Sequence, residues 1–242
     1  MTEQTKPNDE NKEQGGEMAR RQQQAVDMGS ATVATGDGTI HTLTIVGQIE
    51  GHQLLSSQTK TTKYEHILPM LASIEESPEI DGLLVLLNTA GGDVEAGLAI
   101  AELIAGMEKP TVSLVLGGGH SIGVPLAVAA KKCFIAPTAS MTLHPVRMSG
   151  TVLGVPQISA YFRRIQDSIV DFIAANSRVS PETLRELMQR NGQLMGEAGS
   201  VVYGPEAVEL GLCDSLGSLR EALSCLHQMI ADKRQTARGS DT

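Results

Sequence analysis

The sequence predicts an α/β fold with a parallel sheet. Strand-like and helix-like patterns alternate along the chain, as they do when each strand is followed by a crossover helix. Two of the strand candidates, residues 82–88 (GLLVLLN) and 111–116 (TVSLVL), are continuous apolar runs, which is typical of strands covered on both faces. A glycine-rich turn joins each of these two runs to the helix that follows it. We found no internal repeat.

The first half of the folded region alternates between strands and helices. Residues 42–49 (TLTIVGQI) form the first predicted strand. Residues 63–77 carry isoleucine and leucine at helical spacing, and Pro78 ends this helix. The apolar strand at 82–88 leads into a helix over 94–107, which Pro110 separates from the strand at 111–116.

The second half becomes mainly helical. A helix over 122–130 is followed by two short strands at 133–136 and 141–144. Residues 156–176 have one apolar side and predict an amphipathic helix. Ser180 followed by Pro181 is typical of a helix start. The remaining predicted helices are 206–210 and 219–230.

The two ends of the chain are polar. Residues 1–37 contain almost no large apolar side chains, so we predict a disordered tail followed by a single domain over 38–231. Residues 232–242 are predicted to be a polar tail that frays. The N-terminal segment lacks the apolar core of a secretory signal, and no apolar run approaches ~20 residues, so we expect a cytoplasmic protein without an integral membrane segment.

Composition narrows the classes of partner and cofactor. The net charge of −9 disfavours phosphate backbones and anionic lipids, and the three Phe, three Tyr and absent Trp leave little for base stacking, so we expect no nucleic-acid partner. The three cysteines show no CxxC spacing, which favours reduced thiols over a disulfide framework or a zinc site. We therefore predict no metal and no cofactor.

The two glycine-rich turns carry the candidate chemistry. The turn at 117–123 (GGGHSIG) places Ser121 at the start of a helix, and the turn at 90–93 (AGGD) permits close backbone approach to a substrate. His144 ends a later short strand that can reach the same crevice. Serine and histidine together supply a nucleophile and a general base, and free amides at a helix start can hold an oxyanion.

Other interpretations of these residues stay open at this point. One alternative is that Ser121 simply caps its helix. A histidine at a strand end is more often structural than catalytic. Gly91 and Gly92 can bind phosphate, although the sequence lacks GxGxxG and GxxxxGK[ST]. Paired glycine turns also build the oxyanion hole of acyl-CoA enzymes of the crotonase type.

Several stretches in register resemble the ClpP serine proteases. They are residues 87–123 (LNTAGGDVEAGLAIAELIAGMEKPTVSLVLGGGHSIG), 134–145 (FIAPTASMTLHP) and 206–214 (EAVELGLCD). The signatures GGGHSIGVPLAV, MTLHPVRMSGTVLGVPQ and KTTKYEHILP are similar to those of translocation-enhancing members of this family. The resemblance implies the ClpP/crotonase-like fold with repeated β-β-α units.

The resemblance also implies a site and partners. Ser121 is the implied nucleophile and His144 its base, and the N–H groups of Gly92 and Ile122 form the implied oxyanion hole. The expected substrate contacts are Gly91, Gly119 and Pro145. The implied substrates are peptides or unfolded protein segments. A homo-oligomeric ring is expected, and a Clp-type ATPase is a possible partner.

The third member of the triad departs from the family pattern. The position of the family aspartate falls near Gly199, and Glu197 is the nearest carboxylate that can orient His144. Weaker candidates are Asp167 and Asp171. A Ser–Lys dyad with Lys131 or Lys132 is a further alternative. The altered position also leaves open a non-catalytic scaffold or assembly factor that assists protein export.

Overall fold

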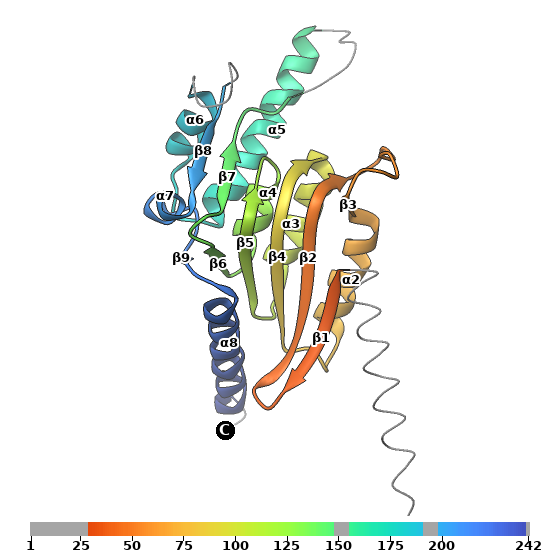
Figure 1. Cartoon of the computed structure of the whole chain (residues 1–242), viewed down its shortest axis with the longest axis vertical. Helices are drawn as coiled ribbons and strands as arrows, with labels where there is room; N and C mark the ends of the chain where they lie inside the picture. The colour runs from red at the N-terminus through yellow and green to blue at the C-terminus, as the bar shows by residue number, and fades with distance from the viewer. Residues whose placement is uncertain (1–28, 148–154, 191–197, 241–242) are drawn as a thin grey trace, which may run out of the picture.

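The computed structural model describes residues 29–147, 155–190 and 198–240. A twisted sheet forms the centre of the molecule, with helices packed against it (Figure 1). The strands of the path β1-β2-β4-β5-β6-β9 follow one another across the sheet, and β7 and β8 extend it beyond the end of β5. The alternation of strands and helices, and with it the predicted α/β class, is confirmed.

The main strands pair in parallel. Strands β2 (Gly38–Glu50), β4 (Gly82–Gly92), β5 (Thr111–Gly119) and β6 (Lys132–Ile135) lie side by side in this order. β1 (Ser30–Thr35) pairs antiparallel with β2. The short strands are β3 (Thr61–Lys63), β7 (Ser140–Leu143), β8 (Ser200–Tyr203) and β9 (Ser215–Leu216).

Both faces of the sheet are covered, which explains the continuous apolar run in β4. Leu83, Val85 and Leu87 belong to the larger core, which is shared with helices α2, α3, α4 and α5. Leu84, between them, packs on the opposite face with Leu226 of α8. Successive strand residues point to opposite faces, so a strand covered on both sides must be apolar at every position.

The helices lie where the sequence predicts them, and α8 is longer than predicted. Their bounds are α2 Tyr64–Glu76, α3 Val94–Gly106, α4 Gly123–Val128, α5 Val155–Ala175, α6 Pro181–Gln189, α7 Gly204–Glu209 and α8 Leu219–Ser240. Asp93 caps α3 by accepting from the Ala96 N–H at 2.9 Å, and Ser180 caps α6 as the sequence predicts. No helix in the described ranges is long and apolar enough to cross a membrane.

The predicted boundaries of the two tails differ from the structure. β1 lies inside the segment assigned to the disordered tail, because its small and mostly exposed residues pair with β2 through the backbone and need little burial. The helix α8 continues through residues assigned to the C-terminal tail, with Arg234 paired to Asp81 at 2.8 Å. The rest of the predicted N-terminal tail, residues 1–28, lies outside the described residues.

Burial of His41 predicts an acid-sensitive fold. His41 on β2 is buried, with Nδ1 2.8 Å from Thr32 Oγ1, and burial lowers the pKa of its imidazole below the usual 6.5. The unfolded chain therefore binds this proton more readily, and stability falls as the pH drops below about 6.5. We expect the urea concentration at the unfolding midpoint to be lower at about pH 5.5 than at about pH 7.5. This decrease should be smaller in His41→Asn. An equal fall in both proteins would contradict this role.

Candidate active site

Ser121 sits in a strained turn between β5 and α4. Its φ is +57°, and it is the one non-glycine residue with a positive φ in the described part of the chain. A side chain in this conformation costs about 1–2 kcal/mol, so the surroundings must hold it. The Ser121 N–H donates to the Thr142 carbonyl of β7 at 2.8 Å, and the Ser121 carbonyl accepts from the Val124 N–H at 3.0 Å.

Two glycines allow the first turn and helix α3 to approach the turn that contains Ser121. A Cβ on Gly91 would lie 2.7 Å from the Cβ of Ser121, and the φ of Gly91 is +92°. A Cβ on Gly97 of α3 would lie 2.4 Å from Cγ1 of Ile122. Neither position can hold a side chain without displacing the turn that contains Ser121. Gly91 therefore serves close packing as well as backbone conformation, and Gly97 serves close packing of α3.

The interpretation of Ser121 as a helix cap is wrong. The residue at the N-cap position of α4 is Ile122, and no side chain caps this helix. The Ser121 hydroxyl has no hydrogen-bond partner among the described residues and lines a cavity instead. It is therefore available to a bound molecule.

His144 directly follows β7 and is half-buried. Its Nδ1 lies 2.7 Å from the carbonyl oxygen of Pro145. A carbonyl can only accept, so this contact places the proton of the neutral ring on Nδ1. The lone pair is then on Nε2, which is the atom that a general base needs.

Ser121 and His144 line one cavity of about 160 Å³. Gly92 and Ile122, the two predicted oxyanion residues, line it as well. The rest of its wall is mainly apolar, formed by Val94, Val124, Leu143, Val146, Ile169, Ile173 and Met188, with Arg147 in addition. The fold thus brings together four predicted site residues that three separate segments of the chain contribute.

Two amide groups at this cavity are free to act as donors. The Asp93 N–H donates to Ile49 of β2 at 3.0 Å, and successive N–H groups of a strand point to opposite edges, so the Gly92 N–H points toward the β5 side. The Ser121 and Gly123 N–H groups are used by Thr142 and His120, whereas the Ile122 N–H has no acceptor in the described ranges. In the described part of the chain, Gly92 and Ile122 therefore supply the amides that find no acceptor.

The three predicted substrate contacts lie behind this wall. Gly91 packs against Ser121, and Gly119 is buried against Val115 and Met141. The Pro145 carbonyl holds His144. None of the three is among the residues that line the cavity.

Comparison with known proteins agrees with this geometry. A family model described as Clp protease matches residues 38–219. The chain belongs to the Clp protease family. It is 55% identical over 196 residues to the translocation-enhancing protein TepA of Halalkalibacterium halodurans, covering 81% of this chain and 76% of that one.

More distant relatives are proteolytic subunits of ATP-dependent Clp proteases. The subunit of Streptococcus sanguinis is 23% identical over 170 residues, which is 67% of this chain and 82% of that protein. Subunit 1 of Chlamydia muridarum is 25% identical over 140 residues, covering 55% and 69%. Membership in this family confirms the predicted ClpP/crotonase-like fold.

No carboxylate of the described residues lines the cavity beside His144. Asp167 is paired with Arg185 at 3.2 Å, and Asp171 faces a different hollow, next to Phe172. Gly199, near the family aspartate position, is buried and donates its N–H to the Arg190 carbonyl at 2.9 Å. Glu197 lies outside the described residues, so its predicted role stays a prediction.

A Ser–Lys dyad does not fit the structure. Lys132 pairs with Val112 at the start of β5, whereas Ser121 follows the end of that strand. The strand rises by roughly 23 Å between Val112 and Gly119. Lys131 Nζ donates to the Glu108 carbonyl at 2.5 Å, at the same end of the sheet as Lys132.

The described residues contain no cluster of three or more His, Cys, Asp or Glu that could hold a metal ion.

His120, the residue before Ser121, is tied to the site through β7. Its Nδ1 lies 2.8 Å from Thr142 Oγ1, and Thr142 is also the residue whose carbonyl accepts from Ser121. His120 and Ser121 thus bind the same residue of β7, two positions before His144. The contact depends on a side chain from another strand, which the sequence pattern could not show.

This contact predicts a positioning role for His120. Replacing it with alanine removes the link to Thr142 and loosens β7, so we expect kcat for peptide hydrolysis to fall about tenfold with little change in KM. His120→Asn keeps a polar group near the Nδ1 position and should recover most of the rate. Thr142→Val should match His120→Ala, and the double variant should lose no more than either single one. Additive losses would contradict the link.

Proposed function

We propose that the chain is a serine endopeptidase that hydrolyses peptides or unfolded protein segments. The observation that carries the proposal is the shared cavity of Ser121, His144, Gly92 and Ile122. Its apolar wall favours substrates with an apolar side chain before the scissile bond. We also propose a homo-oligomeric ring, as the family resemblance implies, with a Clp-type ATPase as an optional partner, and a cytoplasmic location.

In the proposed reaction, Ser121 Oγ attacks the scissile carbonyl carbon while His144 Nε2 accepts the hydroxyl proton. The Gly92 and Ile122 amides donate to the oxyanion of the tetrahedral intermediate. His144 then gives its proton to the leaving amine, and the acyl-enzyme forms. Water, deprotonated by the same imidazole, hydrolyses the ester and restores the Ser121 hydroxyl.

A backbone carbonyl orients His144, whereas a carboxylate does so in the usual serine-protease triad. The Pro145 carbonyl fixes its tautomer but carries no full charge to stabilise the imidazolium. Glu197 remains our sequence-based candidate for that charge. Ser121 and His144 share no hydrogen bond in the structure, and such catalytic contacts often tighten only when substrate binds.

The second candidate function is a non-catalytic factor that assists protein export. Two observations favour it: Gly199 near the family aspartate position, and the name of the relative TepA, which refers to translocation. This alternative uses the same fold without hydrolysis. It predicts that loss of the Ser121 hydroxyl leaves any effect on export intact.

The two candidates can be separated by labelling with a fluorophosphonate, which reacts with activated serines. We expect the purified full-length chain to be labelled, with the modified peptide containing Ser121. Prior heat denaturation should abolish the labelling, which controls for non-specific reaction. Modification of a different serine, or no modification while a known serine peptidase is labelled in parallel, would reject the peptidase and favour the export factor.

A further inference from the structure

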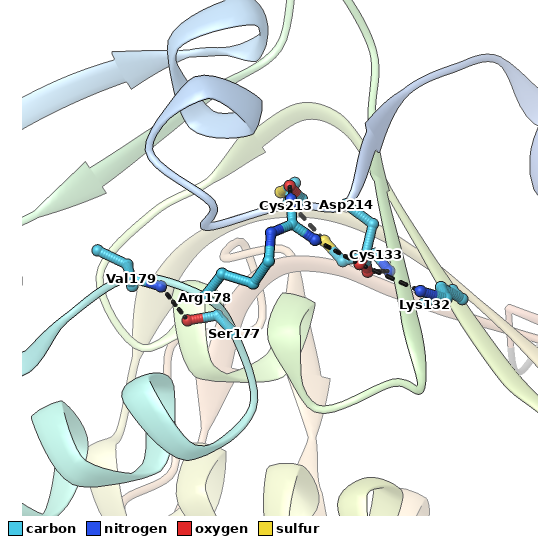
Figure 2. Close-up of polar contacts among 7 residues, drawn as sticks. All are labelled: Lys132, Cys133, Ser177, Arg178, Val179, Cys213 and Asp214. Atoms are coloured by element: carbon cyan, nitrogen blue, oxygen red, sulfur yellow. Dashed lines mark hydrogen bonds and ion pairs between the residues drawn. The ribbon is translucent and has the colours of Figure 1, made fainter.

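Two cysteine side chains meet in the core, on the opposite side of β5 from β4. Cys133 of β6 and Cys213, which follows α7, are buried, and their Sγ atoms are 3.1 Å apart (Figure 2). This is only about 1 Å longer than a covalent S–S bond. The two residues are 80 positions apart in the chain, so their contact is created entirely by the fold.

The backbone around the two thiols is held from both sides. The Cys133 N–H donates to the Asp214 carboxylate at 2.9 Å, and the Asp214 N–H donates to the Cys133 carbonyl at 2.9 Å. The next residues, Phe134 and Ser215, pair as parallel strands. The two chain segments are therefore fixed in register at the position where the thiols meet.

Two cations fix Asp214 in turn. Its Oδ1 accepts from Lys132 Nζ at 3.3 Å and from Arg178 Nη1 at 3.1 Å, and Arg178 Nη2 also reaches the Cys213 carbonyl at 3.4 Å (Figure 2). One carboxylate thus connects the backbones on both sides of the thiol pair. This network reduces the conformational freedom that disulfide formation would otherwise have to remove.

We propose that Cys133 and Cys213 are a redox pair that a peroxide converts into an intrachain disulfide. One thiolate attacks hydrogen peroxide and becomes a sulfenic acid, with release of hydroxide, which takes up the thiol proton to become water. The second thiol then attacks this sulfur, the S–S bond forms, and a second water leaves. Two thiols are oxidised and one peroxide is reduced in total.

The surroundings of the pair make this reaction slow. Contact with the Cys133 thiol, together with burial, raises the pKa of Cys213 well above its usual value, so little thiolate exists at neutral pH. The third cysteine, Cys225 of α8, is only half-buried and contacts neither of the other two in the described structure. Met141 Sδ lies 3.8 Å from Cys213 Sγ and is the competing target for peroxide.

The cross-link would stabilise the part of the fold that contains the candidate site. The loop it closes runs from Cys133 of β6 to Cys213, just before β9, and includes His144. Closing a long loop removes freedom mainly from the unfolded chain. The inference does not depend on peptidase activity, because it concerns thiols outside the cavity that Ser121 lines.

The test uses the purified, reduced full-length chain. It is treated with hydrogen peroxide, quenched with catalase, denatured and alkylated, and its peptides are mapped by mass spectrometry. We expect a Cys133–Cys213 linked peptide lacking two hydrogen atoms, with alkylation confined to Cys225. Formation should be faster at about pH 9 than at about pH 7. The oxidised protein should melt about 5 °C or more above the reduced one, a difference that a reductant abolishes.

Two variants control the assignment. Cys225→Ser should form the same link, and Cys213→Ala should form none and show no rise in melting temperature. The wild-type map alone decides the question if a core variant fails to fold. Alkylation of both Cys133 and Cys213 after oxidation, their conversion to sulfinic acids, or a methionine sulfoxide at Met141 without the link would overturn the proposal.

Discussion

Ser121→Ala should lower kcat/KM for hydrolysis of an unfolded protein or an apolar peptide by about a thousandfold or more. The substitution removes the nucleophile and leaves the rest of the cavity unchanged. Because no described residue binds the Ser121 hydroxyl, the variant loses no hydrogen bond and should keep its stability. Hydrolysis is followed with a quenched fluorescent peptide, and folding is checked by thermal unfolding.

Ser168→Ala is the matched control for this experiment. Ser168 is an exposed serine of α5 whose hydroxyl donates to the Arg164 carbonyl, outside the Ser121 cavity. We expect its hydrolysis rate to equal that of the wild type. If Ser121→Ala hydrolyses the peptide as fast as this control, Ser121 is not the nucleophile and the catalytic assignment fails.

His144→Ala should cause a loss of similar size, about a thousandfold in kcat. Without the imidazole, the Ser121 hydroxyl has no base to accept its proton, whereas the apolar wall that binds substrate remains. KM should therefore change little. Because alanine leaves a space where the half-buried ring lay, added imidazole should restore part of the rate in this variant.

His66→Ala provides the control for His144, because His66 is exposed on α2 and does not line the cavity. It should retain full activity and should not respond to imidazole. A His144→Ala protein that keeps the wild-type rate would show that another group accepts the proton. The tautomer of His144 that the Pro145 carbonyl fixes would then not matter for catalysis.

Much of the fold could be predicted because its signals are local. The apolar run of β4 indicates burial on both faces, and Pro110 separates α3 from β5 without reference to any other segment. Strands β1, β3, β8 and β9 were missed because they are short or polar and exist through pairing with a partner. Backbone pairing leaves no periodic signal in the sequence of the strand itself.

In the candidate site, too, local motifs could be predicted and contacts between distant segments could not. Ser121, His144, Gly92 and Ile122 were found from motifs, and all four line one cavity. The support of His144 was not predictable, because it comes from the adjacent backbone carbonyl of Pro145. Likewise, the contacts of His120 with Thr142 and of Cys133 with Cys213 join segments that are distant in the chain.

The sequence alone determined the α/β class and the order of its main elements, because glycines, prolines and apolar periodicity act over a few residues, and its resemblance to the ClpP serine proteases indicated the nucleophile and base candidates. Only the tertiary structure decided which groups meet: two unpaired amides beside a strained serine, no described carboxylate behind the histidine, and a thiol pair in the core. Those contacts depend on how strands stack and how helices cover them, and packing of that kind is a property of the whole chain.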